Sequence, residues 1–447
     1  MYISNTEEER KQMLAQIGVE KFEDLIKKSI PAELLSNKYN LPEGLTEIQA
    51  YRKIKDLSEK NKIAKNFVGA GVYERYIPAA LKNILSRNEY VTAYTPYQAE
   101  ASQGILQTIY EYQSTVCALY EMDCSNASMY DGSTSFAEAL KACVRITQKK
   151  KILYSSLVNK RYIEVAKTYF SNNEIEFIEI PHRDGKTDLD KLKDLIDEKT
   201  AAVAISNPNF LGSIEDIASV SEIAKKNGAL SVCAADPISL SILQTPGSCG
   251  FDFAVGEGQS LGLPMSYGGP YLGIFTCKKE HLRQMPGRIC GMTKDKEGKR
   301  GFVLTLQARE QHIRRDKAPS NICSNQALCA LNATVYCALL GPSGLKKVAY
   351  RNNELANKAL EELIKIEGIK RKFNAPFFNE FVIDLPVNAR ELRRKLVNDF
   401  AVDPGLTLEF MGKDFENSLL VCLTETKEES DIIALKVALK IELEGKI

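Results

Sequence analysis

The feature that most restricts the fold of this chain is an alternation of strand-like and helix-like segments between residues 151 and 277. Apolar runs of strand length lie at Lys151–Ser155, Ile175–Ile180, Ala201–Ser206, Leu230–Ala235, Phe251–Gly256 and Tyr271–Cys277. Segments with helical periodicity separate several of them, at 159–170, 188–197, 214–226 and just after Pro237. Strands that alternate with helices form a mostly parallel sheet covered on both faces. The sequence therefore predicts an α/β fold whose ligand site lies at the carboxyl ends of the strands.

The regions on either side of this alternation have a different character. Residues 1 to about 65 show helical periodicity without a core of their own, and residues 67–103 are irregular. A long helix is expected from about residue 324, followed by two strand-like runs (377–385, 418–424) and two helices (388–400, 428–444). We predict three parts: a helical arm with an irregular segment that faces the active site (1–100), a large α/β domain (101–325), and a linking helix with a small α+β domain (326–447).

Composition argues against several classes of function. The chain has 59 Lys and Arg against 58 Asp and Glu, so its net charge of +1 would attract neither nucleic acid nor a membrane surface. Its most apolar stretch, 327–340, is interrupted by Asn332 and is too short to span a bilayer. The cysteines show no metal-ligand spacing, and the amino terminus has no apolar signal region. We therefore expect a cytoplasmic protein without a metal site.

Two neighbouring strands end in loops that are similar to the cofactor end of a pyridoxal phosphate (PLP) enzyme. One apolar strand leads to Asp236, and the next leads to a polar loop that contains Gln259. Such an enzyme needs an acidic partner for the pyridine nitrogen and a lysine that holds the cofactor as a Schiff base. No lysine occurs between Lys226 and Lys278, and the amide of Gln259 cannot form an imine. Because Asp236 precedes Pro237, it can equally cap a short helix.

A third candidate element lies just before the predicted helix 136–147. Ser133 and Thr134 follow Asp131 and Gly132, so hydroxyl and backbone N–H groups converge at the positive end of this helix. This arrangement suits a phosphate group. It also suits ordinary helix capping, which is the commoner use of such residues. The sequence leaves both interpretations open.

Two further segments are rich in polar and aromatic groups. The irregular stretch 94–103 begins with Tyr94-Thr95-Pro96-Tyr97-Gln98, and long irregular stretches in compact proteins often carry function. The stretch 309–315 combines arginines, which can bind carboxylates in bidentate fashion, with His312, which can move protons. A solvated face or an interface would both account for the second stretch.

Several long motifs, in this order, resemble the P-protein of the glycine cleavage system, glycine dehydrogenase (decarboxylating), in its two-subunit form. The motifs are YTPYQ (94–98), NASMYDG (126–132), NPNFLGSIED (207–216), GEGQSLGLPMSYGGP (256–270), PGRICGMT (286–293) and LTLQAREQHIRR (304–315). The resemblance is to the amino-terminal type subunit, called subunit 1 or alpha, and runs from about Met13 to about Gly344. Beyond about residue 365 it is weaker.

This resemblance implies the PLP-dependent transferase fold of the aspartate aminotransferase type. It also implies a heterotetramer of two alpha and two beta subunits (subunit 2), in which beta keeps the lysine that aligns with Gln259. The PLP would then be held by the partner, with none bound covalently to this chain. The complex would decarboxylate glycine and pass the aminomethyl group to the lipoyl group of the H-protein. The implied enzyme is glycine dehydrogenase (aminomethyl-transferring), EC 1.4.4.2, inactive as this chain alone.

No catalytic residue is expected in this chain by itself. From polarity and position, we expect the following side chains to reach the partner's active site or the interface: Tyr94, Thr95, Tyr97, Gln98, His312, Arg314, Arg315, Ser320 and Asn321. Remnants of a cofactor site would be Ser133, Thr134, Asp236 and Gln259. Two alternatives are a self-sufficient PLP aminotransferase or decarboxylase, which would need a lysine such as Lys278, and a cofactor-free scaffold or regulatory subunit.

Overall fold

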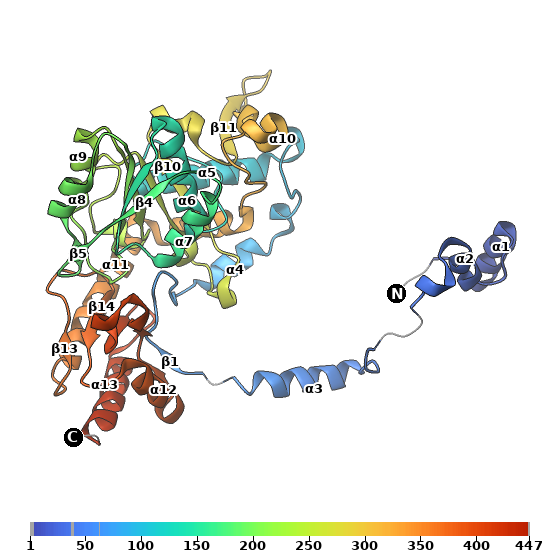
Figure 1. The fold of residues 1–447 in the computed structure, drawn as a ribbon. Helices are drawn as coiled ribbons and strands as arrows, with labels where there is room; N and C mark the ends of the chain where they lie inside the picture. The colour runs from blue at the N-terminus through green and yellow to red at the C-terminus, as the bar shows by residue number, and fades with distance from the viewer. Residues whose placement is uncertain (1–3, 37–39, 62, 446–447) are drawn as a thin grey trace. The chain divides into compact units, whose positions relative to one another are not determined.

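The structure, a computed structural model, describes residues 4–36, 40–61 and 63–445. Its contacts divide the chain into two compact units, Met1–Lys62 and Ile63–Ile447. The first unit contains α1 (Glu7–Ile17), α2 (Phe22–Ser29) and α3 (Glu47–Ser58), drawn in blue in Figure 1. None of these helices has a buried residue. The three helices confirm the predicted helical character of this region.

The second unit is organised around a seven-stranded sheet in the order β2-β10-β9-β8-β7-β3-β4. The strands are β2 (Cys124–Ser125), β3 (Lys151–Ser155), β4 (Glu176–Ile180), β7 (Thr200–Asn207), β8 (Leu230–Ala235), β9 (Phe253–Glu257) and β10 (Gly273–Cys277). The central pairs are parallel, whereas β10 runs antiparallel to β9 and to β2. The mostly parallel α/β sheet is confirmed. The short strand β2 has no strand pattern in the sequence, because two residues are too few to show periodicity.

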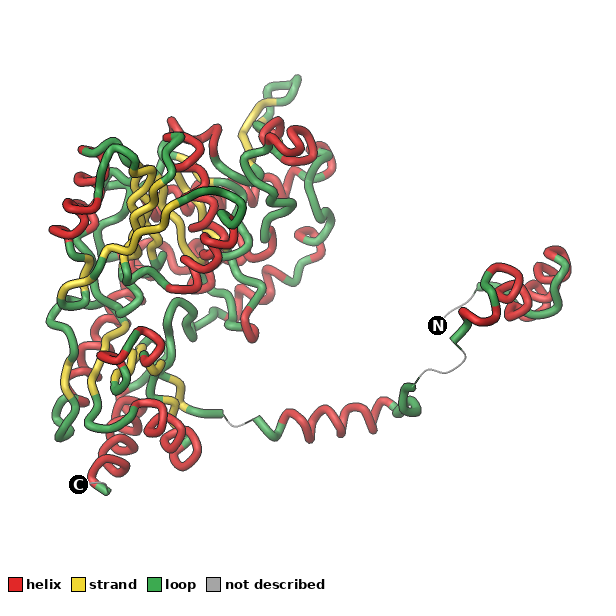
Figure 2. Tube along the Cα trace, in the orientation of Figure 1, coloured by secondary structure: helices red, strands yellow, loops and turns green. Residues whose placement is uncertain are grey.

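Helices cover both faces of this sheet, as Figure 2 shows in red around the yellow strands. They are α5 (Gln103–Tyr120), α6 (Gly132–Thr147), α7 (Lys160–Tyr169), α8 (Leu189–Leu195) and α9 (Ile217–Lys226). Successive side chains of a strand point to opposite faces. In β8, Val232 and Ala234 therefore join the core formed with α6 and α7, whereas Cys233 and Ala235 join the core formed with α5 and α9. The carboxyl ends of β7, β8 and β9 lie at one edge of this three-layer arrangement.

The long helix α11 (Ala327–Leu363) connects the main core to the core of the C-terminal part. It is interrupted at Gly341, which has φ 62°, just before Pro342. By length and composition, α11 is the one helix in the described part of the chain that could cross a membrane. However, 44% of its most apolar window is buried inside the fold.

The C-terminal part contains a four-stranded antiparallel sheet in the order β13-β14-β17-β16. Its elements are β13 (Lys370–Arg371), β14 (Glu380–Asp384), α12 (Ala389–Phe400), β15 (Val402–Asp403), β16 (Leu406–Thr407), β17 (Ser418–Cys422) and α13 (Glu429–Glu444). The strand β1 (Lys65–Asn66) pairs with β15, so the residues just before the irregular segment are hydrogen-bonded to the C-terminal part. The other elements are α4 (Ala79–Leu85), β5 (His182–Arg183), β6 (Lys186–Thr187), β11 (Ile289–Lys294), β12 (Arg300–Thr305) and α10 (Gln311–Arg314).

Backbone contacts join the C-terminal part to the loop that follows β7. The Ile214 N–H donates to the Pro376 carbonyl at 2.8 Å, and the Phe378 N–H donates to the Gly212 carbonyl at 3.1 Å. Gly212 has φ +81°, and a Cβ at this position would lie 2.0 Å from the Glu380 carbonyl oxygen. A side chain therefore has no room there. The predicted three-part division of the chain stays a prediction, since the contacts separate only the first unit from the rest.

Candidate functional site

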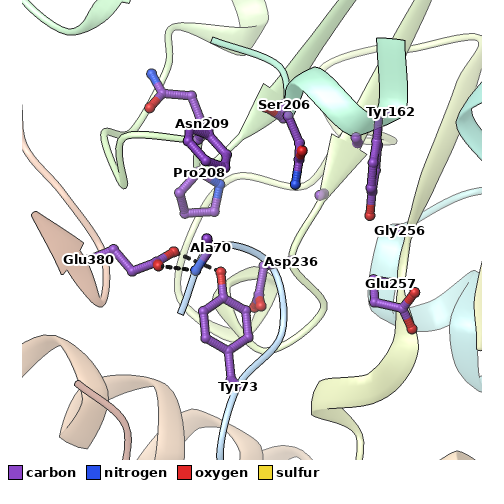
Figure 3. A pocket seen from close by; sticks show the side chains of 15 residues that line it. Ala70, Tyr73, Tyr162, Ser206, Pro208, Asn209, Asp236, Gly256, Glu257 and Glu380 are labelled. Atoms are coloured by element: carbon purple, nitrogen blue, oxygen red, sulfur yellow. Dashed lines mark hydrogen bonds between the residues drawn. The ribbon is translucent and has the colours of Figure 1, made fainter. Parts of the chain in front are cut away.

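A cavity of about 80 Å³ lies where β7, β8 and β9 end, with room for several water molecules. Figure 3 shows it from close by. The large sheet and its helices supply Asn159, Tyr162, Ser206, Pro208, Asn209, Phe210, Ala234, Ala235, Asp236, Gly256 and Glu257. The irregular segment supplies Ala70, Gly71 and Tyr73, and the C-terminal sheet supplies Glu380. Residues 69–76 are called the inserted segment below, because they lie between these two regions.

Gln259 holds the inserted segment in place and is fully buried. Its Oε1 accepts a hydrogen bond from the Tyr73 N–H at 2.9 Å. Its Nε2 donates to the carbonyls of Tyr73 at 2.9 Å and of Leu263 at 2.7 Å. The amide thus uses both of its N–H groups and its oxygen on the backbone. At the position expected for a cofactor lysine, the chain therefore has a glutamine that joins two backbone segments by hydrogen bonds.

Asp236 has two partners within the chain. Its Oδ1 accepts a hydrogen bond at 2.8 Å from the N–H of Ser239, the first residue of the short 3-10 helix Ser239–Ser241. Its Oδ2 lies 3.9 Å from Nη2 of Arg75, whose side chain has no exposure. Nη1 of Arg75 also donates to Oε2 of Glu425 at 2.9 Å, and the guanidinium lies 5.0 Å from the centre of the Tyr73 ring. Burial raises the pKa of Asp236, and the positive charge of Arg75 opposes this effect.

Glu257 occupies the start of α6. Its Oε2 accepts from the Gly132 N–H at 2.9 Å, and its Oε1 accepts from the N–H groups of Gln259 at 3.0 Å and Leu272 at 3.1 Å. Burial raises the pKa of Glu257 to about 7, although these three donors favour the charged form. The first N–H of α6 therefore already has a carboxyl oxygen of this chain as its partner.

The hydroxyls of Ser133 and Thr134 are engaged in capping α6. Oδ1 of Asp131 accepts from the Thr134 N–H at 2.8 Å and from the Ser133 hydroxyl at 2.7 Å. The Thr134 hydroxyl accepts from the Asp131 N–H at 3.2 Å. These contacts are those of a capping box.

Glu380 ties the C-terminal sheet to the inserted segment. Figure 3 shows its two carboxylate oxygens accepting from the Ala70 N–H at 2.6 Å and from the Tyr73 hydroxyl at 2.7 Å. Burial raises the pKa of Glu380 to about 7 and that of Tyr73 well above its usual value. The sequence analysis missed Arg75, Glu257 and Glu380. For Glu257, its place two residues before Gln259 on the same loop was an available signal.

A second group of polar residues, which is only partly exposed at the surface, includes two of the predicted interface residues. Tyr97 and His312 lie with ring centres 6.0 Å apart, and Nη2 of Arg288 donates to the Tyr97 hydroxyl at 3.1 Å. Oε2 of Glu310 lies 3.6 Å from both Nε of Arg288 and Nδ1 of His312. Tyr97 is 54% exposed, whereas Arg288 is buried. Tyr97, Arg288, Glu310 and His312 are called the surface cluster below.

The other predicted interface residues differ in exposure. The exposed ones are Tyr94, Gln98, Arg314, Arg315 and Asn321, while Thr95 is half-buried. Ser320 is buried, and its hydroxyl donates to Oε1 of Glu138 at 2.6 Å. The Ser320 hydroxyl is therefore already engaged inside the chain.

Lys278, the lysine considered for a self-sufficient enzyme, is engaged elsewhere. Its Nζ donates to Oδ1 of Asp252 at 2.7 Å. The hydrogen bonds that Asp252 receives hold its pKa at about 2. Asp252, Glu280 and His281 form the one group in the described residues whose side chains could together bind a metal ion. The Asp252 carboxylate already accepts hydrogen bonds from Lys278 and from the Ser231 hydroxyl.

The sequence matches the model of the family "Glycine cleavage system P-protein" over residues 1–439. The chain belongs to this P-protein family. It is 48% identical over 432 residues to a probable glycine dehydrogenase (decarboxylating) subunit 1 of Solidesulfovibrio magneticus, covering 96% of this chain and 97% of that protein. A protein of the same name from Desulforamulus reducens is 47% identical, covering 98% of this chain and 99% of that protein.

Solved structures agree with this assignment of the P-protein family. A crystal structure of glycine decarboxylase (P-protein) of the glycine cleavage system, in inhibitor-bound form, has a TM-score of 0.90 and 41% identity, covering 99% of each chain. A NifS-like protein from Rickettsia africae has a TM-score of 0.64 at 14% identity, covering 86% of this chain and 100% of that chain, which shows the fold alone. The chain thus has the PLP-dependent transferase-like fold that the sequence predicted.

The cofactor of that fold class does not fit the residues at this cavity. Among the described residues no lysine lines this cavity, and position 259 is a glutamine bonded to the backbone. Glu257 takes the first N–H of α6, and Asp236 faces the guanidinium of Arg75. PLP would therefore meet a carboxylate at its phosphate and a cation at its ring nitrogen.

Proposed function

We propose that this P-protein is subunit 1 of a glycine dehydrogenase (decarboxylating), EC 1.4.4.2, and that it acts in glycine decarboxylation only with a second subunit. The names of the relatives from Solidesulfovibrio and Desulforamulus, which specify a subunit 1, support the need for a partner. The observation that carries the proposal is Gln259. Its amide stands where the cofactor lysine is expected, and both of its N–H groups and its oxygen are hydrogen-bonded to the backbone.

The finer form of this proposal concerns the assembly. Two copies of this chain and two of subunit 2 form a heterotetramer, and subunit 2 holds the PLP. Glycine is the substrate, and the aminomethyl group passes to the lipoyl group of the H-protein. PLP supplies the electron sink for loss of carbon dioxide. The cytoplasm is the proposed location, in line with the distribution of cysteines in the sequence.

The part that this chain plays is to complete the active site of the partner from outside. The surface cluster offers groups for this role, because Tyr97 and His312 are exposed. Arg288 donates a hydrogen bond to the Tyr97 hydroxyl, and Glu310 lies beside the His312 imidazole. An exposed imidazole beside a carboxylate can bind or move a proton. Tyr94, 87% exposed, adds an aromatic surface that would exclude water once covered.

Neither alternative function has an observation in its favour. A self-sufficient enzyme would need Lys278, which is paired with Asp252. A cofactor-free scaffold would bind the partner without changing its chemistry. The measurement that separates it from a working subunit is activity in a reconstituted mixture.

The test is reconstitution with purified components. This chain, subunit 2 with PLP, and lipoylated H-protein are assayed alone and together for carbon dioxide exchange from glycine. We expect neither subunit alone to show exchange and the mixture to show it. Full activity of subunit 2 without this chain would contradict the proposal, and so would activity of this chain alone.

A further inference from the structure

We propose that this chain carries built-in substitutes for the two charged ends of PLP. The carboxylate of Glu257 takes the position of the phosphate, and the guanidinium of Arg75 takes the position of the protonated ring nitrogen. The site is therefore closed to the cofactor at three points, of which the absent lysine is only one. This inference rests on the fold and the contacts of the cavity, and it holds whether or not the proposed role of the surface cluster is correct.

The phosphate end is defined by α6. Helix N-termini bind anions because their first N–H groups have no partner within the helix and the helix dipole is positive there. In this chain the Gly132 N–H, the first of α6, donates to Glu257 at 2.9 Å. The N–H groups of Gln259 and Leu272 donate to the same carboxylate. Glu257 thus gathers three backbone donors from two loops, as the oxygens of a phosphate would.

The backbone at Gly132, whose N–H Glu257 binds, is already closely packed. A Cβ built on Gly132 would lie 2.2 Å from the Tyr162 hydroxyl and 3.1 Å from Cβ of Glu257. A bound phosphate would place its negative charge against the Glu257 carboxylate in a buried region. Like charges in such surroundings repel strongly. The glutamate must move or be replaced before a phosphate can bind at this helix.

The ring end is defined by Asp236 at the end of β8. In PLP enzymes an acidic residue pairs with the protonated pyridine nitrogen. Here the cation near Asp236 is Arg75, which reaches the cavity on the inserted segment and has no exposure. The segment is fixed by Gln259 on one side and by Glu380 on the other. Arg75 therefore cannot leave unless contacts to both regions of the fold break.

These contacts lead to an expectation about the lysine itself. A lysine placed at position 259 would face the Tyr73 carbonyl, which now accepts from Gln259 at 2.9 Å. Its amine would have a hydrogen-bond acceptor there, but the phosphate and the ring of PLP would have no free counter-charges. Restoring the lysine alone should not restore binding of the cofactor.

The first experiment uses the full-length chain with Gln259→Lys. The protein is incubated with PLP, reduced with borohydride, digested and analysed by mass spectrometry for a pyridoxyl group on residue 259. We expect no label above that of the wild-type chain at its surface lysines. Stoichiometric labelling of residue 259, with a visible Schiff-base absorbance band before reduction, would overturn the inference.

The second experiment tests the phosphate end without PLP. Glu257→Ala frees three backbone donors, so inorganic phosphate should raise the melting temperature of this variant by several degrees. The wild-type melting temperature should change no more in phosphate than in a sulfate-free salt of equal ionic strength. Glu222→Ala removes an exposed glutamate paired with Lys226 and serves as the matched control. Equal phosphate stabilisation of wild type and Glu257→Ala would contradict the inference, as would no stabilisation of Glu257→Ala. If Glu257→Ala does not fold, the Gln259→Lys labelling decides alone.

Discussion

The cavity and the surface cluster both contain a buried arginine, a carboxylate and a tyrosine, but the two regions are completed differently. In the cavity, Tyr73 is buried and its hydroxyl is bonded to Glu380. In the surface cluster, Tyr97 is 54% exposed, and the side chain of His312 is 44% exposed. The polar groups of the cavity find their partners within the chain, whereas the surface cluster exposes its aromatic side chains to solvent. Changes in the cavity should therefore alter stability, and changes in the surface cluster should alter activity of the complex.

The largest expected effect is that of Arg75→Met. The substitution leaves the carboxylates of Asp236 and Glu425 without their buried cation. Removal of one partner of a buried ion pair costs about 3–5 kcal/mol in the free energy of unfolding. Denaturant unfolding of the isolated chain measures this loss. The exposed pair Arg351–Glu354 provides the control Arg351→Met, for which a change below about 1 kcal/mol is expected. Equal losses for both variants would remove the distinction between the regions.

The next effect concerns pH and the two buried glutamates of the cavity. Burial raises the pKa of Glu257 and of Glu380 from 4.5 to about 7. Between these values the folded protein keeps protons that the unfolded chain has released, so the contribution of these two groups to stability is full below about pH 4.5 and is lost as the pH rises through about 7. Each carboxyl contributes at most about 3–4 kcal/mol to this fall.

Glu380→Gln removes one of the two titrating groups, so about half of the fall should disappear in a series of unfolding curves between about pH 5 and 8. The groups that face Glu380 are Tyr73, Arg75 and Asp236. Glu442→Gln, at a carboxylate paired with Lys395 near the surface, is the control that should leave the slope unchanged. A wild-type protein that gains stability over this range would show that the sign is wrong.

The third effect appears in activity and not in stability. His312→Ala should lower glycine-dependent carbon dioxide exchange of the reconstituted complex by about tenfold or more, about 1.4 kcal/mol in transition-state free energy. The free energy of unfolding of the isolated chain should change by less than about 0.5 kcal/mol, because the side chain is exposed. Tyr350→Ala, at another exposed aromatic, should change neither quantity. Unchanged exchange in His312→Ala would exclude this histidine from the partner's active site.

The smallest effect is predicted for Lys278→Met. This lysine pairs with Asp252 and is 30% exposed, so its loss should cost little stability and no activity of the complex. Lys279→Met is the matched control. Loss of exchange in Lys278→Met alone would revive a direct chemical role for this residue.

The sequence predicted the main sheet better than the cavity, and the reason is physical. Periodicity is a local property, so strands such as 151–155 and 230–235 were predicted at the bounds that the structure shows. The predicted helix 136–147 in fact starts at Gly132, because Asp131 caps it. Gln259 was identified because a required residue type was absent. Arg75 and Glu380 escaped notice because their partners lie hundreds of residues away in sequence, where no local pattern can reveal them.

The backbone contacts between the C-terminal part and the loop after β7 have a consequence for motion. Separating the two would break the Ile214–Pro376 and Phe378–Gly212 hydrogen bonds and pull the Glu380 backbone away from Gly212. It would also release Ala70 and Tyr73 from Glu380. Regions linked in this way open rarely, and their amide protons exchange slowly with solvent. We therefore expect the loop after β7 and the C-terminal part to move together as one body within the second unit.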